Sequence, residues 1–279
     1  MDQAAGRAGF GTLLRRWRGL RGLSQMALSL DAGVSARHLS WLEGGKAQPS
    51  RAMVLRLATR LELPLRERNA LLVAAGYAPL YAERPLDDPG LAQARGALQR
   101  LLHAFEPNPA LAVDRHWNLV AHNRLVPPLI ARVAPALRQP PANVLRISLH
   151  PEGLAPMIDN LPAWRHYVLY RLDRQSAATG DPELQRLRAE LAALPPPPGS
   201  APWPPGDEES APAVSDVAVP LVLNTPLGTL RFLTTLTVFG APRDVTLSEL
   251  AVETLLPADE PTAATLRAVA AQLPEPAPA

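Results

Sequence analysis

Residues 24–50 read SQMALSLDAGVSARHLSWLEGGKAQPS, and this stretch decides the fold of the first part of the chain. Ser24 and Ser35 are good helix N-caps, because a serine hydroxyl accepts a hydrogen bond from the first turn of a helix. Gly33 lies between them and suits a tight turn at positive φ. The pattern therefore predicts a helix over 25–31 and a second helix over 36–43, joined by a short turn.

The sequence around this stretch predicts three more helices and a basic unit. Apolar residues recur at helical spacing over 10–21, 51–61 and 65–76, so we expect five short helices with a shared core. Residues 1–76 carry 12 arginine or lysine and five acidic residues, whereas the remainder carries 16 and 21. A small basic unit joined to a larger acidic one indicates that only the first meets a polyanion.

Two short helices around a tight turn are typical of a helix-turn-helix. In that motif the first helix lies across the DNA backbone, and the second enters the major groove and presents its first turn to base edges. For this chain we expect the first helix to turn Met26, Ala27 and Leu30 inward. We expect the second helix to bury Leu39 and Leu42.

The stretch GLSQMALSLDAGVSARHLSWLEGGKAQPS resembles the XRE-type, lambda-repressor-like helix-turn-helix family. The pieces PLRERNALLVAAGYAPLY, HPEGLAPMIDN and TPLGTLRFLTTLTVFGAPRDVTLSELAVETLLPADEPT resemble a subgroup with an MmyB-like ligand-binding domain of PAS-like fold. The resemblance implies a sequence-specific transcriptional regulator. It covers nearly the whole chain except residues 195–212.

The resemblance also implies which residues contact double-stranded DNA. Gln25 is expected at a phosphate, and Arg37 suits the O6 and N7 atoms of guanine. Trp41 departs from the polar side chain that is usual at its position, so it either faces DNA or belongs to the core. The full expected DNA-binding set is Ser24, Gln25, Ser35, Ala36, Arg37, His38, Ser40, Trp41 and Lys46. Arg18 and Glu43 are interpreted as a structural pair that ties the first helix to the third.

Residues 1–77 are thus expected to form the DNA-binding domain, 78–90 a linker and 91–279 the second domain. A β-hairpin is predicted over 110–123, an extended piece at 143–149, and strong strands over 217–225 and 229–239, with helices between and after them. The proline-rich segment 195–212 is predicted to be an exposed, mobile loop. The fold class expected is an all-α five-helix domain followed by an α+β PAS-like domain with an antiparallel sheet.

The resemblance implies that the second domain senses a small apolar molecule, and a long-chain fatty acid is one such ligand. Arg171 could anchor a carboxylate, because a guanidinium binds one with two hydrogen bonds. The other expected ligand-binding residues are Trp117, Trp164, Tyr167, Tyr170 and Thr235. In the alternative hypothesis, this domain serves only dimerisation or recruits a partner protein.

Other functions find little support in the sequence. Cysteine is absent, and the six histidines form no HExxH pattern, so we expect no metal site. GxSxG, GxGxxG and Walker motifs are also absent, and we expect neither a cofactor nor catalytic residues. No apolar run is long enough to cross a membrane. The expectation is a cytoplasmic homodimer that binds a pseudo-palindromic operator.

Overall fold

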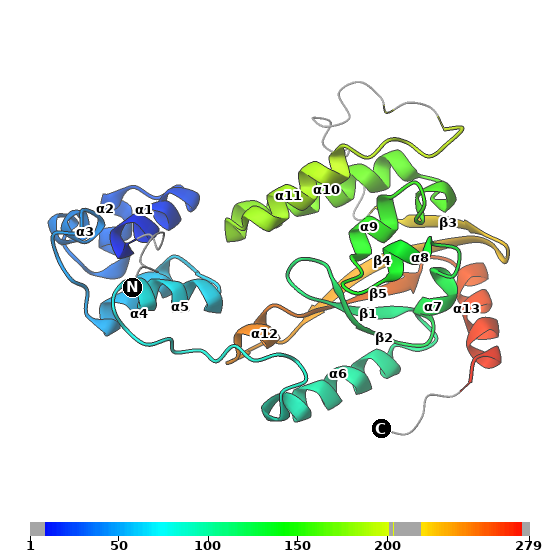
Figure 1. The fold of residues 1–279 in the computed structure, drawn as a ribbon, viewed down its shortest axis with the longest axis horizontal. Coiled ribbons are helices and arrows are strands. Elements are labelled where there is room, and N and C mark those ends of the chain that lie inside the picture. Colours follow the sequence, from blue (N-terminus) through cyan, green and yellow to red (C-terminus); the bar gives the residue numbers. More distant parts are fainter. Residues whose placement is uncertain (1–8, 201–202, 204–218, 275–279) are drawn as a thin grey trace. The chain divides into compact units, whose positions relative to one another are not determined.

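The structure is a computed structural model that describes residues 9–200, 203 and 219–274. The chain divides into two compact units (Figure 1). The first consists of Met1–Arg84, Ala177–Gly180 and Ala241–Ser248, and the second of Pro85–Ser176, Asp181–Gly240 and Glu249–Ala279. The proline-rich segment predicted as a loop lies largely outside the described residues, as does the start of the strand predicted from residue 217.

The first unit contains the five predicted helices: α1 (Phe10–Leu20), α2 (Gln25–Ala32), α3 (Ala36–Glu43), α4 (Arg51–Arg60) and α5 (Leu65–Ala74). Three of them begin at a serine whose side chain accepts a backbone hydrogen bond, namely Ser24, Ser35 and Ser50. Gly33 adopts a left-handed conformation with φ of 64° and ends α2. The caps and the glycine therefore set the boundaries that the sequence predicted.

The inward face of α2 differs from the prediction. Met26 and Leu30 are 59% and 75% exposed, and the helix instead buries Leu28 and Ala32 in the core of the unit. The helix has only eight residues, so its pattern of apolar positions fits two faces almost equally well. Buried Leu39 and Leu42 of α3 match the prediction.

Gly11 brings α1 close to the end of α3. A Cβ atom at this position would lie 2.5 Å from the carbonyl oxygen of Glu43 and 2.6 Å from that of Leu42. Such distances are far below van der Waals contact, so only glycine permits this approach. The first helix thereby supports the backbone at the end of the second helix of the motif.

The second unit is built on a five-stranded antiparallel sheet in the order β2-β1-β5-β4-β3. The strands are β1 (Ala110–Val113), β2 (Leu119–His122), β3 (Leu221–Thr225), β4 (Gly228–Val238) and β5 (Ala251–Pro257). The two predicted hairpins, β1–β2 and β3–β4, are both present, and β5 joins them. The unit is therefore the α+β domain with an antiparallel sheet that the sequence predicted.

The remaining helices are η1 (Pro89–Leu91), α6 (Ala92–Ala104), α7 (Val126–Leu129), α8 (Pro135–Arg138), α9 (Val144–Leu149), η2 (Ala155–Met157), α10 (Leu161–Thr179), α11 (Pro182–Ala192), α12 (Val245–Ser248) and α13 (Glu260–Gln272). The extended piece predicted at 143–149 is wrong, because Val144–Leu149 form α9. Asn143 caps this helix by accepting hydrogen bonds from the N–H groups of Leu145 and Arg146. None of the described helices is long and apolar enough to cross a membrane.

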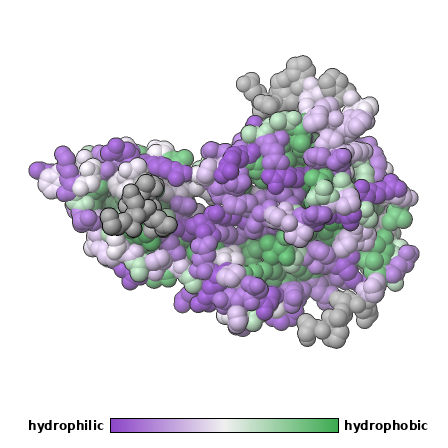
Figure 2. All heavy atoms as spheres, in the orientation of Figure 1, coloured by the Kyte–Doolittle hydropathy of each residue, from purple (hydrophilic) through white to green (hydrophobic). Residues whose placement is uncertain are grey.

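The two faces of the sheet carry different cores. One face packs against residues of α9, α10 and α11 to form the main core of the unit, and the other packs against Leu98 and Leu102 of α6 (Figure 1). Part of the sheet is uncovered: Leu233, Leu236 and Val238 of β4 are exposed. Figure 2 shows hydrophobic surface over the strand region of this unit.

Candidate nucleic-acid interface and ligand cavity

The first turn of α3 presents an ordered arginine to solvent. Arg37 is exposed, and the central carbon of its guanidinium lies 4.6 Å from the ring centroid of Trp41, one turn later. Trp41 is itself 41% exposed. This cation–π contact restricts the arginine to a few conformations and gives the exposed tryptophan a partner on the helix surface. Trp41 is therefore not among the buried core residues.

The other residues expected at DNA belong to α3, to α2, to the N-caps of these two helices and to the turn after α3. Ser35 and Ser40 are exposed, whereas Ala36 and His38 are half-buried. Ser24 is exposed and caps α2. Lys46, the only lysine of the chain, is exposed in the turn after α3, next to Gly45 at φ of 69°. The exposed polar groups therefore gather on α3, its cap and the turn that follows.

Glu43 fixes the orientation of α3 from inside the unit. Its side chain is fully buried and accepts two hydrogen bonds from Arg18 of α1, at 2.6 Å from Nε and 3.0 Å from Nη2. The side-chain amide of Gln25 donates a third, at 2.7 Å. Helices α1, α2 and α3 thus meet at one carboxylate. In this arrangement the amide nitrogen of Gln25, the residue expected at a phosphate, is bound to Glu43.

The pKa of Glu43 reflects two opposing effects. Burial raises the pKa, because it disfavours the charged carboxylate. Hydrogen bonds from Arg18 and Gln25 lower it, as do the charges of Arg18 and Arg15, and the pKa lies below its ordinary value. Glu43 is therefore an ionised, structural carboxylate at neutral pH.

A mainly apolar cavity lies in the second unit, between the sheet and the helices that cover one of its faces. Its volume is about 80 Å³. Aliphatic side chains from four strands and from α7, α9 and α10 line most of it. A second apolar space of about 260 Å³ shares Leu129 of α7 with the first and reaches Leu266 of α13. Together the two spaces reach the lower end of the range for small-molecule pockets, roughly 300–1,000 Å³.

One end of the 80 Å³ cavity is polar. Arg171 of α10 donates a hydrogen bond of 2.9 Å from Nη1 to Glu253 of β5. The guanidinium lies over two aromatic rings, 4.0 Å from the centroid of Trp117 and 6.0 Å from that of Tyr167. Its Nη2 atom is buried and has no hydrogen-bond partner in the described structure. The cavity therefore combines an apolar body with one charged pair.

The structure brings some of the expected ligand-binding residues together and separates others. Trp164 and Arg171 line the cavity. Trp117 is buried against Arg171, and the ring of Tyr167 packs against Trp164 with centroids 5.2 Å apart. Tyr170 is exposed and does not line the cavity, and neither does Thr235. Neighbouring Thr234 faces the cavity instead, because successive side chains of a strand point to opposite faces.

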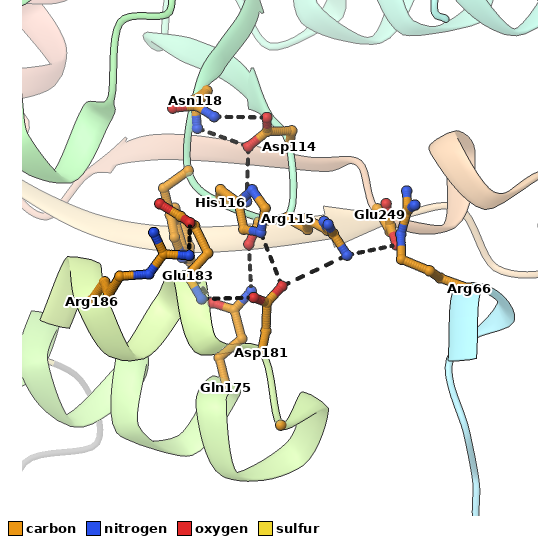
Figure 3. Close-up of polar contacts among 12 residues, drawn as sticks. Arg66, Asp114, Arg115, His116, Asn118, Gln175, Asp181, Glu183, Arg186 and Glu249 are labelled. Atoms are coloured by element: carbon orange, nitrogen blue, oxygen red, sulfur yellow. Dashed lines mark hydrogen bonds and ion pairs between the residues drawn. The ribbon is translucent and has the colours of Figure 1, made fainter. Parts of the chain in front are cut away.

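The turn between β1 and β2 holds Trp117 in place. Asp114 accepts hydrogen bonds from the backbone N–H groups of His116 and Asn118 (Figure 3). Trp117 has φ of 68°, unusual for a residue with a side chain. Its indole N–H donates to Gln175 of α10, 2.8 Å away. These contacts keep the indole against Arg171 despite the strained backbone.

His116 connects the same turn to the start of α11. Its Nε2 atom lies 2.9 Å from Oδ2 of Asp181, and Arg115 lies 3.6 Å from the same oxygen (Figure 3). Burial raises the pKa of Asp181, but the hydrogen bond from His116 lowers it, as do a backbone N–H and the charge of Arg115. The pKa therefore lies below its ordinary value. The carboxylate stays charged and continues to hold the turn at neutral pH.

Sequence reasoning missed Glu253. It stands in the strand sequence AVETLLP, where every neighbour is apolar or uncharged. A lone charge in such a strand needs a buried partner, which is the signal that could have identified it. Its partner Arg171 is 82 residues away in the chain, so spacing alone does not reveal the pair.

The features of both units correspond to known domain families. A model for the MmyB-like transcription regulator ligand binding domain matches residues 94–269, and one for a helix-turn-helix domain matches residues 10–71. The chain belongs to the MmyB-like transcription regulators. In this MmyB-like chain the helix-turn-helix match contains α1 to α4, and the ligand-binding match contains every strand of the sheet. The resemblance seen in the sequence is thereby confirmed.

Two solved structures are similar to parts of this MmyB-like chain. The restriction-modification controller protein C.AhdI from Aeromonas hydrophila is 36% identical, over 21% of this chain and 89% of that chain, with a TM-score of 0.21. An RNA-binding light-oxygen-voltage receptor is 15% identical, over 96% of this chain and 65% of that chain, with a TM-score of 0.27. Neither TM-score is high enough to carry an argument. No curated protein matches the chain.

Proposed function

We propose that this chain is a ligand-responsive transcription regulator that reads DNA with α3 and binds a small, mainly apolar molecule in the cavity of its second unit. One observation carries the proposal: a mainly apolar cavity with a single charged pair lies in a chain that also presents a helix-turn-helix. The proposal includes no catalytic activity. The cavity residues Arg171 and Glu253 already bind each other, and no nucleophile with an adjacent base lines the cavity among the described residues.

Arg37 is the residue proposed to read sequence. It is exposed on the first turn of α3, and its stacking on Trp41 limits the conformational freedom lost on binding. Ser35, Ser40 and Lys46 are proposed to contact the surrounding phosphates. One short helix reads only a few base pairs. We therefore propose that a homodimer binds a pseudo-palindrome with half-sites about one helical turn apart.

The ligand is proposed to enter both apolar spaces of the second unit. The 80 Å³ cavity alone is too small for a long chain. An apolar tail that passes Leu129 would reach the larger space, if that side chain changes its rotamer. A fatty acid, the ligand type implied by the family resemblance, has such a tail. If the second domain serves only dimerisation or recruits a partner, neither space needs to take up a ligand.

The experiment that tests the DNA-binding part begins with selection of binding sites from random DNA by the full-length chain. Affinities are then measured for the selected site and a scrambled one. Replacing Arg37 by alanine is expected to weaken binding to the selected site by about 1–3 kcal/mol and to relax selectivity at one base pair. Arg138→Ala, which removes an exposed arginine from α8 of the second unit, is the matched control. Equal losses on both DNAs would show that Arg37 does not read bases.

A further inference from the structure

The charged pair at the end of the cavity is already neutral as a whole. Arg171 contributes one positive charge and Glu253 one negative charge, joined by a hydrogen bond of 2.9 Å. Their side chains are only 18% and 10% exposed. Among the residues that the structure describes, no other charged residue lines the 80 Å³ cavity. A bound group at this end therefore meets a net charge of zero rather than a free cation.

The hydrogen-bonding capacity of the pair is not exhausted. The Nη2 group of Arg171 is buried and has no hydrogen-bond acceptor among the described residues, and a buried donor without an acceptor costs free energy. Nη2 therefore needs an oxygen acceptor. The adjacent carboxylate of Glu253 can accept a hydrogen bond from the same ligand group. A group that both accepts and donates fits the two residues together.

We propose that the ligand of this cavity has an uncharged polar head, of the primary amide or alcohol class, on an apolar body. The head oxygen accepts from Nη2 of Arg171, and its N–H or O–H donates to Glu253. The apolar body lies among the aliphatic side chains beside Trp164 and Val168. This inference rests on the proposed function, since it assigns the ligand class of the same cavity.

A carboxylate head fits this end less well, for an electrostatic reason. It would bring a second negative charge next to Glu253, and Arg171 is the only cation that lines this cavity among the described residues. Like charges close together in a site shielded from water are strongly unfavourable. The nearest alternative cation among the lining residues is Arg132, which is exposed and lines the second space. An acid would therefore place its head there and leave Nη2 of Arg171 unpartnered.

The test uses the full-length chain and three probes of equal chain length: octanamide, 1-octanol and octanoate. Binding is measured by isothermal titration calorimetry at neutral pH. We expect octanamide to bind at least about tenfold more tightly than octanoate. Glu253→Gln removes the negative charge of the pair, so it is expected to reverse the order and favour octanoate. Glu183→Gln is the matched control, because it removes one carboxylate from an exposed pair with Arg186 on α11, outside the cavity.

The possible results separate this inference from the proposed function. If octanoate binds the unchanged chain as well as octanamide does, the uncharged head is wrong, while the ligand-binding function stands. If Glu253→Gln leaves the order unchanged, Glu253 does not set the preference and the proposed contact of the head with Glu253 is wrong, while the ligand-binding function stands. If none of the three probes binds, both the inference and the cavity's sensing function fail. The comparison of octanamide with octanoate on the unchanged chain tests the uncharged head even if Glu253→Gln does not fold.

Discussion

A single buried carboxylate connects helices α1, α2 and α3, and α3 is the helix proposed to read DNA. Glu43 is bound by Arg18 from α1 and Gln25 from α2, while it is itself the last residue of α3. A buried ion pair contributes little net stability relative to apolar residues, but the loss of one partner leaves a charge uncompensated. The pair therefore determines geometry more than it adds stability.

Replacing Glu43 by alanine is expected to destabilise the first unit by roughly 3–5 kcal/mol, because it leaves the largely buried charge of Arg18 without its carboxylate partner. Hydrogen exchange of the amides in α1–α3 of the full-length chain would measure this loss. The matched control is Asp31→Ala, which breaks an exposed pair with Arg60 at 3.6 Å and should cost less than about 1 kcal/mol. Equal losses in the two variants would contradict the structural role.

The same residue makes the first unit sensitive to acid. The pKa of Glu43 is lower in the folded chain than its ordinary value, so the folded state binds fewer protons than the unfolded state around that pKa. The stabilisation is complete above the unfolded pKa, about 4.3, and is lost as the pH falls through the folded pKa. The protection factors of the α1–α3 amides, which correct for the slower intrinsic exchange in acid, should therefore fall on acidification below about pH 4.5. In Glu43→Gln this part of the pH dependence should be absent.

At the scale of elements, the close contact between α1 and the end of α3 is possible because Gly11 has no side chain. Gly11→Ala would place a methyl group against the carbonyl oxygens of Leu42 and Glu43. Because these atoms belong to the backbone, α3 must shift, and we expect a loss of about 1–3 kcal/mol in stability and weaker DNA binding. Thermal denaturation and DNA titration of the full-length chain would measure both.

Gly19→Ala is the control for this contact, since it lies on the same helix with no atom near its missing Cβ. Alanine favours helix at such an exposed position by roughly 0.5–1 kcal/mol, so this variant should be slightly more stable. If both glycine variants gained stability, α1 would not be pressed against α3 as the structure describes.

The boundaries of the elements could be predicted from the sequence more reliably than their buried faces. Caps and glycines have local physical causes, so the bounds of α2, α3 and α4 followed from Ser24, Ser35 and Ser50. Which face of a helix or strand is buried depends on tertiary contacts, so the buried face of the short helix α2 could not be predicted from the sequence. For the same reason it favoured Thr235 over Thr234, because the strand pattern does not say which face meets the cavity. Glu253 needed a partner far along the chain, which only the folded structure provides.

At the scale of the whole molecule, regulation requires ligand binding and DNA binding to be thermodynamically coupled. If a ligand changes the affinity for DNA, DNA must change the affinity for the ligand by the same factor. A coupling of about 1–3 kcal/mol is typical, which corresponds to roughly 5–150-fold. We expect octanamide titrations with and without the selected operator to give dissociation constants that differ by such a factor. Identical constants would favour a second domain that serves only dimerisation or partner recruitment.

The turn after α3 has a practical consequence for labelling chemistry. The chain has no thiol and a single side-chain amine, on Lys46, which is exposed beside the proposed DNA-reading helix. An amine-reactive reagent used at a pH that spares arginine therefore modifies one side chain, apart from the amino terminus. Bound operator should shield Lys46 from acetylation, as measured by mass spectrometry of the peptide that contains it. A fluorophore placed there would report operator occupancy without any engineered residue.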